Sequence, residues 1–325
     1  MRILNTQYSI HNTQTTETIN KYVEIIANKL GNNLEALILV GSFARGEGLT
    51  YQNNGKLELM SDIEFWGVVK NLSTAKSIGI EGEKLTIGFT TRKHLARLKP
   101  YIFTVEAKKF GKVLWGDKSV PGLIPSYSFE DIEPVDGFIL LNNRIVEQLI
   151  LFNKIQNNGS VQQYDFDKGY IQLVNSYLAF NKRYRSLYPE KKEEFFKLYK
   201  DKNTNLAQKV HEAFESLKAN SANYIPNDKA IKEWQELRTH YKEIWLCESV
   251  YVGLPKVRDR IRGWLKVLGN VNKRRLFSIS EVAVNFFRIS PQFLIYCDAA
   301  SLYFSDYIDM VNLEKIVKKW KIIVK

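Results

Sequence analysis

The side chains best suited to chemistry in this 325-residue sequence lie between positions 41 and 64. Gly41 and Ser42 follow the run Leu34–Val40, which is short, apolar and rich in branched residues and therefore predicts a buried strand. A strand that stops at Gly-Ser and passes into a short helix leaves backbone N–H groups that can hold phosphate oxygens. Gly41 would let the backbone approach a phosphate, Ser42 would add a hydroxyl donor, and Arg45 could contact a leaving pyrophosphate.

Asp62 and Glu64 lie two positions apart in Leu57–Val69, which reads as the next strand, so both carboxylates should face the same side. Adjacent carboxylates repel each other, and magnesium would relieve the repulsion because it prefers carboxylate and phosphate oxygens. Each feature alone has a plainer interpretation, since Gly-Ser after a strand is common and Asp-x-Glu on a strand is more often a solvated face. Their succession on two neighbouring strands is the more specific pattern.

This succession resembles the polymerase-β-like nucleotidyltransferase superfamily, whose signature is a hydrophobic strand, Gly-Ser or Gly-Gly, a short helix, and a strand with Asp-x-Asp or Asp-x-Glu. The segment GSFARGEG is similar to the bacterial minimal nucleotidyltransferases, and SDIE is similar to the kanamycin nucleotidyltransferases. The resemblance covers roughly the first 116 residues. Ser42 and Asp62 are 20 positions apart, more than is usual in the family, and the surplus is expected in the loop Thr50–Lys56. The resemblance implies an α/β nucleotidyltransferase core with a small mixed sheet and flanking helices.

The resemblance also implies a third acidic residue on a later strand, where it completes the metal site or deprotonates the attacking hydroxyl. Glu106 is the preferred candidate, because Tyr101–Lys109 reads as a fourth strand. Asp117 is the main alternative, although its place after Gly116 favours a loop or capping role. Glu81 and Glu83 are further alternatives. The predicted catalytic residues and metal ligands are therefore Asp62, Glu64 and Glu106.

The remaining periodicity predicts two domains. A helix over Thr15–Leu30, a third strand over Leu85–Thr90 and a short helix over Arg92–Leu98 complete an α/β catalytic domain spanning 1–116. A segment rich in proline and glycine, 117–136, is the expected linker. Residues 137–325 should form an all-α C-terminal domain, with helical periodicity over 137–156, 165–187, 190–219, 228–250, 254–268, 278–288 and 308–323.

Basic residues outnumber acidic ones, and the net charge of +12 favours polyanions such as nucleotides or RNA without choosing between them. Lys168 opens a predicted helix of the C-terminal half and is a candidate to contact the nucleotide when the domains close, with a solvated position as the plainer alternative. The lysines of Lys191–Lys202 are expected on a solvated helix face.

Cys247 and Cys297 lie far apart, outside any CxxC pattern, and are expected in the core.

The N-terminus lacks the apolar stretch of a secretory signal, and no run approaches the ~18 to 20 apolar residues of a membrane span. We therefore expect a cytoplasmic protein with no membrane partner. The sequence also lacks GxxxxGK[ST], GxGxxG, HExxH and GxSxG patterns, which disfavours the commonest rival enzyme classes.

These features together predict a magnesium-dependent nucleotidyltransferase. Two Mg²⁺ ions would hold a nucleoside triphosphate, expected to be ATP, while an acceptor hydroxyl attacks the α-phosphorus and pyrophosphate leaves. A small-molecule acceptor is favoured. The alternative is a toxin-like enzyme that modifies RNA or protein. A catalytically inactive antitoxin or nucleotide sensor is the non-enzymatic alternative. The sequence leaves the acceptor's identity and the oligomeric state open.

Overall fold

The chain folds into two compact units in the computed structural model, which describes residues 13–53, 56–77, 80, 84–219, 223–252 and 256–324. Unit 1 contains Met1–Glu133, Lys182–Lys197 and Glu215–Ser221. Unit 2 contains Pro134–Asn181, Leu198–Phe214 and Ala222–Lys325. None of the described helices combines the length and apolarity that crossing a membrane requires.

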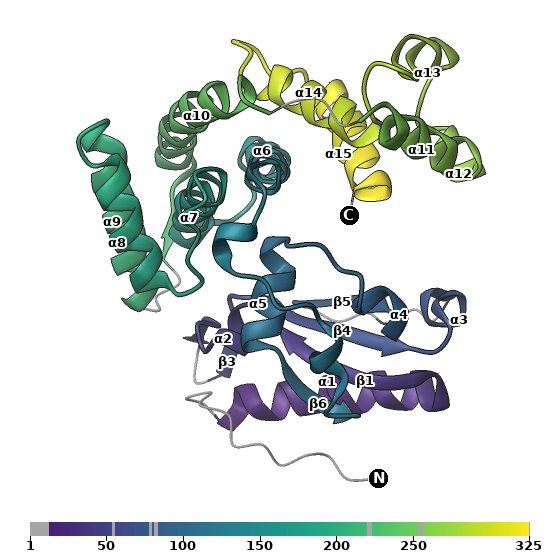
Figure 1. The fold of residues 1–325 in the computed structure, drawn as a ribbon. Coiled ribbons are helices and arrows are strands. Elements are labelled where there is room, and N and C mark those ends of the chain that lie inside the picture. The colour runs from purple at the N-terminus through teal and green to yellow at the C-terminus, as the bar shows by residue number, and fades with distance from the viewer. Residues whose placement is uncertain are drawn as a thin grey trace. The chain divides into compact units, whose positions relative to one another are not determined.

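Unit 1 is built on a four-stranded mixed sheet with the strand order β5-β4-β1-β6 (Figure 1). The strand β1 runs antiparallel to both β4 and β6, whereas β4 and β5 are parallel. A separate pair of strands, β2 and β3, is antiparallel. The bounds are β1 (Leu34–Val40), β2 (Thr50–Asn53), β3 (Lys56–Leu59), β4 (Ile63–Val69), β5 (Leu85–Thr90) and β6 (Lys112–Gly116).

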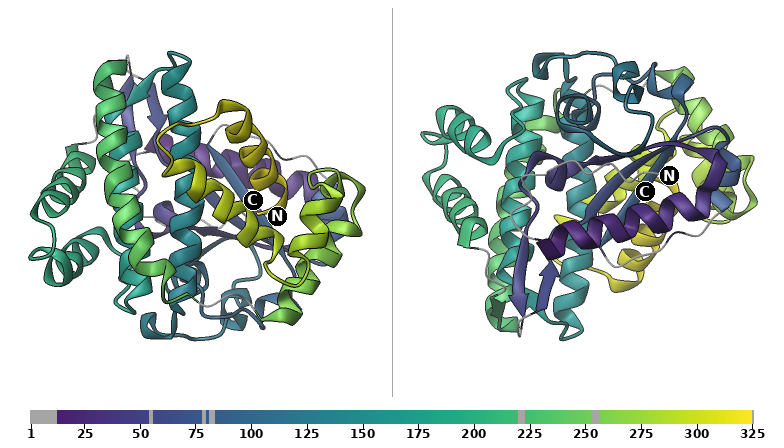
Figure 2. Two further views of the ribbon diagram at one scale, coloured as in Figure 1. Left: turned by 90° about the horizontal axis from the view of Figure 1, so that it is seen from above. Right: turned by 90° about the horizontal axis from the view of Figure 1, so that it is seen from below.

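One face of this sheet packs against the opening helix, α1 (Thr13–Leu30). The buried residues Ile19, Val23 and Ile26 recur in α1 at helical spacing, and Leu37 of β1 belongs to the same core. Figure 2 (right) shows α1 lying along the sheet. Burial of this stripe stabilises a helix that would be marginal in isolation.

The opposite face packs against α4 (Arg92–Leu95), α5 (Ile102–Phe110) and the 3₁₀ turn η2 (Val120–Leu123). Ile38 of β1 and Val68 of β4 belong to this second core. Each of these strands therefore contributes to both cores through alternate residues, as the period of two requires. The predicted mixed sheet with helices on both sides is confirmed.

Two strand predictions are wrong. Helix α5, residues 102–110, stands where a fourth strand is predicted over 101–109, and its buried residues Thr104, Val105 and Ala107 follow helical spacing instead of alternation. Leu57–Val69 is two strands, β3 and β4, separated by a bend at Ser61. The carboxylate expected on the fourth strand therefore lies on a helix.

The residues predicted to form a linker belong largely to unit 1. Val120, Ile124 and Ile132 are almost fully buried there. The prolines and glycines of this segment accompany two 3₁₀ turns, η2 and η3 (Phe129–Asp131), which pack as part of the unit.

Unit 2 is predominantly helical, as predicted. The long helices α6 (Pro134–Gln156), α7 (Gln163–Phe180) and α10 (Asn227–Ser249) pack side by side (Figure 2, left). Helix α14 was not predicted, and the predicted segment 190–219 is two helices, α8 and α9. The chain's other elements are α2 (Gly41–Arg45), α3 (Leu72–Ser77), α8 (Tyr188–Tyr199), α9 (Thr204–Ala219), α11 (Val257–Leu268), α12 (Val271–Arg274), α13 (Ile279–Asn285), α14 (Pro291–Tyr303), α15 (Met310–Ile323), β7 (Val161–Gln162) and β8 (Tyr224–Ile225).

The prediction that both cysteines lie in the core is wrong. Cys247 and Cys297 are free and exposed. Each lies on the outward stripe of its helix, between buried neighbours such as Ile244 and Glu248 on α10.

A buried carboxyl group lies among the long helices of unit 2. Glu248 is 0% exposed, and its Oε2 atom lies 3.2 Å from Oγ of Ser176. Ser176 also lies 2.8 Å from the carbonyl oxygen of Gly137. A hydroxyl has one proton, so if Ser176 donates it to Gly137, a neutral Glu248 can supply the proton of the second hydrogen bond. Consistent with this, burial raises the pKa of Glu248 to about 8.

Glu248 should therefore make the stability of the chain depend on pH. Between pH 4.5 and 8 the unfolded chain carries an ionised Glu248 while the folded chain keeps it protonated, so this group's stabilisation is lost as pH rises. Relative to wild type, Glu248→Gln should gain about 1.4 kcal/mol of unfolding free energy per pH unit across this window. Urea unfolding at several pH values measures the difference. A difference that does not change with pH would show that Glu248 is ionised in the fold.

Candidate functional site

The end of β1 and the start of β4 bring Gly41 and Glu64 into contact. Val40, the last residue of β1, pairs with Glu64 in the sheet. Gly41 follows with φ of +70°, and a Cβ atom built on it would lie 1.6 Å from Oε2 of Glu64. Only glycine tolerates both this backbone conformation and this contact. The predicted phosphate turn and one predicted carboxylate are therefore adjacent.

The turn itself continues as α2 and ends at Gly46, which has φ of +81°. Val40 occupies the N-cap position and has no polar side-chain atom, so it cannot satisfy the first backbone N–H groups of α2. Ser42 is partly exposed in the first turn. An anion held by this turn would therefore lie directly beside the carboxylate of Glu64. An anion and a carboxylate this close would repel each other unless a cation lay between them.

Asp62 lies immediately before β4, two residues from Glu64, and is partly exposed. Ile63 and Phe65 belong to the core beneath α1, so Glu64 faces the other side of the sheet. On the neighbouring strand β5, Thr86 pairs with Glu64 and is exposed, so the sheet is open to solvent at this point. Asp62 forms no ion pair with another described residue. Asp62 and Glu64 therefore both lie beside the turn.

Aromatic rings lie close to these carboxylates. Trp66, two residues after Glu64 on β4, packs edge-on against Phe103 with ring centroids 5.5 Å apart, and Phe103 stacks on Tyr101 at 5.5 Å. Phe103 is 49% exposed although it is a large apolar side chain. The ring cluster Trp66, Tyr101 and Phe103 offers a flat partner for another ring. This cluster is not recognisable in the sequence, because residues 101–109 read there as a strand.

The structure does not gather the three predicted metal ligands. Among the residues that the structure describes, no three His, Cys, Asp or Glu side chains are grouped as metal ligands. Glu106 lies on α5, where its Oε2 atom is 2.6 Å from Nη1 of Arg45 and its Oε1 accepts a hydrogen bond from Oη of Tyr184 at 2.6 Å. Both oxygens of this carboxylate are thus engaged by protein groups, and its expected place beside Asp62 and Glu64 is not found.

Arg45 is likewise engaged by protein carboxylates. Its Nε atom lies 3.1 Å from Glu47, in addition to the contact with Glu106, and the other oxygen of Glu47 accepts from the backbone N–H of Tyr188 at 2.5 Å. Burial alone would lower the pKa of Arg45, but Glu106 and Glu47 outweigh it and raise this pKa. Because the guanidinium already pairs with these two carboxylates, this geometry does not support its expected contact with pyrophosphate.

Lys191 completes this group of charges. It is 1% exposed, and its ammonium lies 5.1 Å from the ring centroid of Tyr184 and 5.7 Å from that of Tyr188. Burial lowers the pKa of Lys191 to about 8, although the carboxylate of Glu106 opposes the shift. The prediction of a solvated helix face is wrong for this lysine. Its spacing from Tyr188 and Tyr184, three and seven positions, is the feature of the sequence that could have revealed it.

Asp117, the alternative third carboxylate, has a structural role at the end of β6. Its carboxylate lies 2.5 Å from Nη2 of Arg92 and accepts from the backbone N–H of Ser119 at 2.8 Å. The hydrogen bond with Arg92 is the main reason that the pKa of Asp117 falls to about 2. This arrangement fits the expected capping role. Two further alternatives, Glu81 and Glu83, lie outside the described residues.

Lys168 lies on α7 in unit 2. There it lines a small cavity of about 130 Å³ together with Arg144 and Glu147. Its contact with a nucleotide stays a prediction.

Comparisons with known proteins find similarity among solved structures alone. No protein-family model matches the chain, and no curated protein matches it. Among solved structures, the chain is similar to the spectinomycin adenyltransferase AAD(9) from Enterococcus faecialis, crystallised with ATP and spectinomycin. The two are 14% identical, the alignment covers 70% of this chain and 99% of that chain, and the TM-score is 0.43. Identity and superposition are both low, so this similarity does not indicate what the chain does.

The geometry of Glu106 predicts that its main contribution is to stability. Glu106→Gln would remove one of the two carboxylates that pair with the mostly buried guanidinium of Arg45, and the free energy of unfolding should fall by about 3 kcal/mol. Asp117→Asn, which alters an exposed ion pair, should change it much less. Urea unfolding compares the two variants. If Glu106→Gln were as stable as wild type and slowed only catalysis, Glu106 would be a catalytic residue after all.

Proposed function

We propose that this chain is a nucleotidyltransferase that moves a nucleoside monophosphate from a magnesium-bound nucleoside triphosphate to an acceptor hydroxyl. The observation that carries the proposal is the contact between the carboxylate of Glu64 and the backbone of Gly41, with Ser42 and Asp62 beside it. A surface that presents anion donors and carboxylates together suits a ligand that combines phosphate with a cation.

The side chains present fit magnesium. Mg²⁺ is typically held by one or two carboxylates, and substrate phosphates and waters supply its other ligands. Asp62 and Glu64 provide two carboxylates at an open part of the sheet, so they would hold the ion. The bound ion would neutralise charge that develops on the transferred phosphoryl group. The two-metal arrangement stays a prediction.

The residues of the turn would orient the triphosphate. The N–H groups of the first turn of α2 and the hydroxyl of Ser42 would donate to phosphate oxygens, and the lack of a side chain on Gly41 would let the chain approach them. The acceptor oxygen then forms a bond with the α-phosphorus as the bond to the β-phosphate oxygen breaks. Pyrophosphate leaves, and the acceptor's proton passes to Asp62 or to water.

Glu106 and Arg45 would act as positioning residues in this scheme. Their ion pair joins α5 to α2, the helix that begins with the phosphate turn. Lys191 and Tyr184 pack against the same pair. The group would fix the direction of the turn without contacting the substrate, and preorganised donors of this kind avoid reorganisation during the reaction.

We further propose ATP as the nucleotide and a small hydroxylated molecule as the acceptor. The ring cluster Trp66, Tyr101 and Phe103 lies on the same side of β4 as Glu64 and could stack on an adenine or on a ring of the acceptor. An RNA acceptor is the principal alternative.

Substitution of either carboxylate should abolish the reaction. Asp62→Asn or Glu64→Gln should reduce pyrophosphate release with ATP, magnesium and candidate acceptors by at least ~100-fold, because metal-bound phosphate would no longer be held in place. Asp117→Asn is the matched control, since it removes a carboxylate of the same unit that is engaged by Arg92, and it should retain activity. Near wild-type pyrophosphate release by either of the first two variants would contradict the proposal.

A further inference from the structure

Two short helices of unit 2 have no residue in the core. Neither α12 nor α13 contains a buried residue, although α13 reads ISEVAVN and is mostly apolar. Helices this short gain most of their stability from packing an apolar face against a neighbour. The part of the chain that the structure describes leaves them without a buried residue, so these helices present apolar side chains to the outside.

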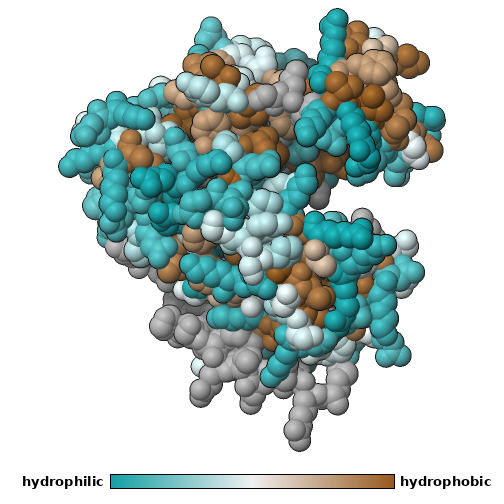
Figure 3. All heavy atoms as spheres, viewed as in Figure 1, coloured by the Kyte–Doolittle hydropathy of each residue, from teal (hydrophilic) through white to brown (hydrophobic). Residues whose placement is uncertain are grey.

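The exposed apolar side chains continue onto the neighbouring elements. Figure 3 shows apolar residues gathered at the upper right, where Figure 1 places α11 and α13. Ile279 is 90% exposed and Phe287 is 63% exposed, and four more large apolar side chains are about half exposed. The six are Val257, Leu265, Val271, Ile279, Val284 and Phe287.

The same segment carries a concentrated positive charge. Residues 256–288 contain nine Lys and Arg and only two acidic residues, and six of the chain's fourteen arginines lie there. Arg260 donates to the carbonyl oxygens of Phe287 and Arg288. Within the described part of the chain, none of the other eight cations forms an ion pair. These eight are Lys256, Arg258, Arg262, Lys266, Lys273, Arg274, Arg275 and Arg288, and with the six apolar residues they make up what we call the α11–α13 surface.

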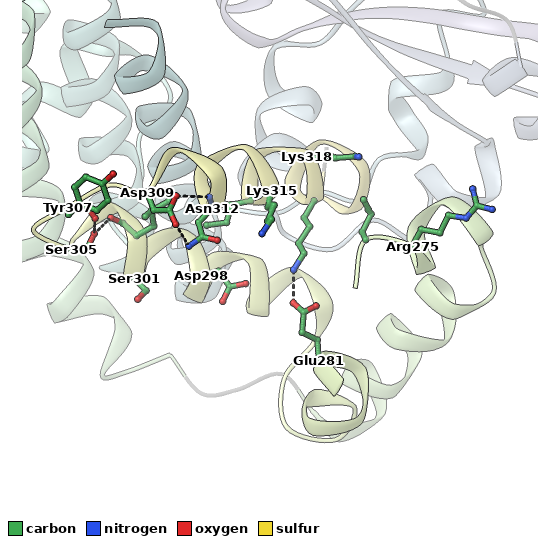
Figure 4. Close-up of a pocket in the computed structure, with 14 residues that line it drawn as sticks. Arg275, Glu281, Asp298, Ser301, Ser305, Tyr307, Asp309, Asn312, Lys315 and Lys318 are labelled. Carbon is green, nitrogen blue, oxygen red and sulfur yellow. Dashed lines mark hydrogen bonds and ion pairs between the residues drawn. The ribbon is translucent and has the colours of Figure 1, made fainter. Parts of the chain in front are cut away.

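A cavity adjoins this surface. Glu281 of α13 is tied to Lys319 of α15 by an ion pair of 2.6 Å, and Figure 4 shows this pair at the side of a cavity of about 820 Å³. Arg275 and Asp298 also line the cavity. The helix α13 therefore has polar side chains and space on its inner side, which explains why its apolar residues are not buried.

The surface is nevertheless held in place. Trp264 of α11 donates from Nε1 to the carbonyl oxygens of Asn285 and Ile289, at 3.2 and 2.8 Å, and Arg260 fixes the backbone between them. A preformed surface loses little conformational entropy when it binds. The exposure of its apolar residues is thus a property of the folded unit.

The composition identifies the kind of partner. Arginine and aromatic residues such as Phe287 are enriched at protein interfaces, and arginine matches the planar, two-oxygen geometry of a carboxylate. RNA would bind the cations but would leave residues such as Ile279 exposed to water. A second copy of the chain, docking through the same surface, would bring like charges together. We infer that the α11–α13 surface docks an acidic amphipathic helix of a partner protein, whose apolar stripe covers the exposed side chains and whose carboxylates pair with the arginines.

A synthetic peptide tests this inference directly. The probe is a helical peptide with leucines at every third or fourth position and glutamates between them, and binding is followed by fluorescence anisotropy. Wild type should bind the peptide, more weakly as salt rises, and the double variants Ile279→Ser/Phe287→Ser and Arg258→Ser/Arg262→Ser should each bind at least ~10-fold more weakly. Thermal unfolding should show that both variants remain folded, because the four side chains are exposed.

Two controls complete the experiment. Val250→Ser and Lys242→Ser alter an apolar and a basic residue that are exposed elsewhere in unit 2, and they should leave peptide binding unchanged. Vesicles containing phosphatidylglycerol and a single-stranded RNA are offered in parallel. Tighter binding of either than of the peptide would overturn the inference, as would peptide binding that survives loss of Ile279 and Phe287.

Discussion

The contact between Gly41 and Glu64 is the constraint on which the rest of the candidate site depends. The strand pairing of Val40 with Glu64 sets it, and the left-handed backbone at Gly41 permits it. A methyl group at position 41 would occupy the place of a carboxylate oxygen. The sheet thus holds an acidic side chain against a turn that offers hydrogen-bond donors to anions. A magnesium-bound phosphate would suit this arrangement, because it carries both a cation for the carboxylate and an anion for the donors.

A second group of charges holds the turn from the other side. Arg45, Glu47, Glu106 and Lys191 are two cations and two anions, all largely buried, with Tyr184 hydrogen-bonded to Glu106. Burying any one of these charges alone would be unfavourable, so the group is stable only as a whole. Within this group Glu106 has a structural role, because it neutralises the buried charge of Arg45. The carboxylates left beside the turn are then Asp62 and Glu64.

Elements that depend on residues close together in the sequence could be predicted, whereas contacts between residues far apart in the sequence could not. The strand Leu34–Val40 and the short helical turn after it are local patterns, and the fold confirms both. The shared face of Asp62 and Glu64 stays a prediction, because Asp62 lies just before the strand. The helix α5 was mistaken for a strand because IFTVEAKKF is rich in β-branched and aromatic residues, and the packing of Val105 and Ala107 overrides that preference. Lys191 was placed in solvent because the partners that bury it, Tyr184 and Glu106, are not all close in sequence.

The most direct test of the central claim is calorimetric titration with α,β-methylene ATP, which binds without being turned over. Wild type should bind this nucleotide tightly with magnesium and much more weakly when EDTA removes the metal. Asp62→Asn and Glu64→Gln should lose the effect of magnesium while unfolding at the wild-type temperature. Binding that is equally strong without magnesium, or that both variants retain unchanged, would place the nucleotide elsewhere and contradict the account.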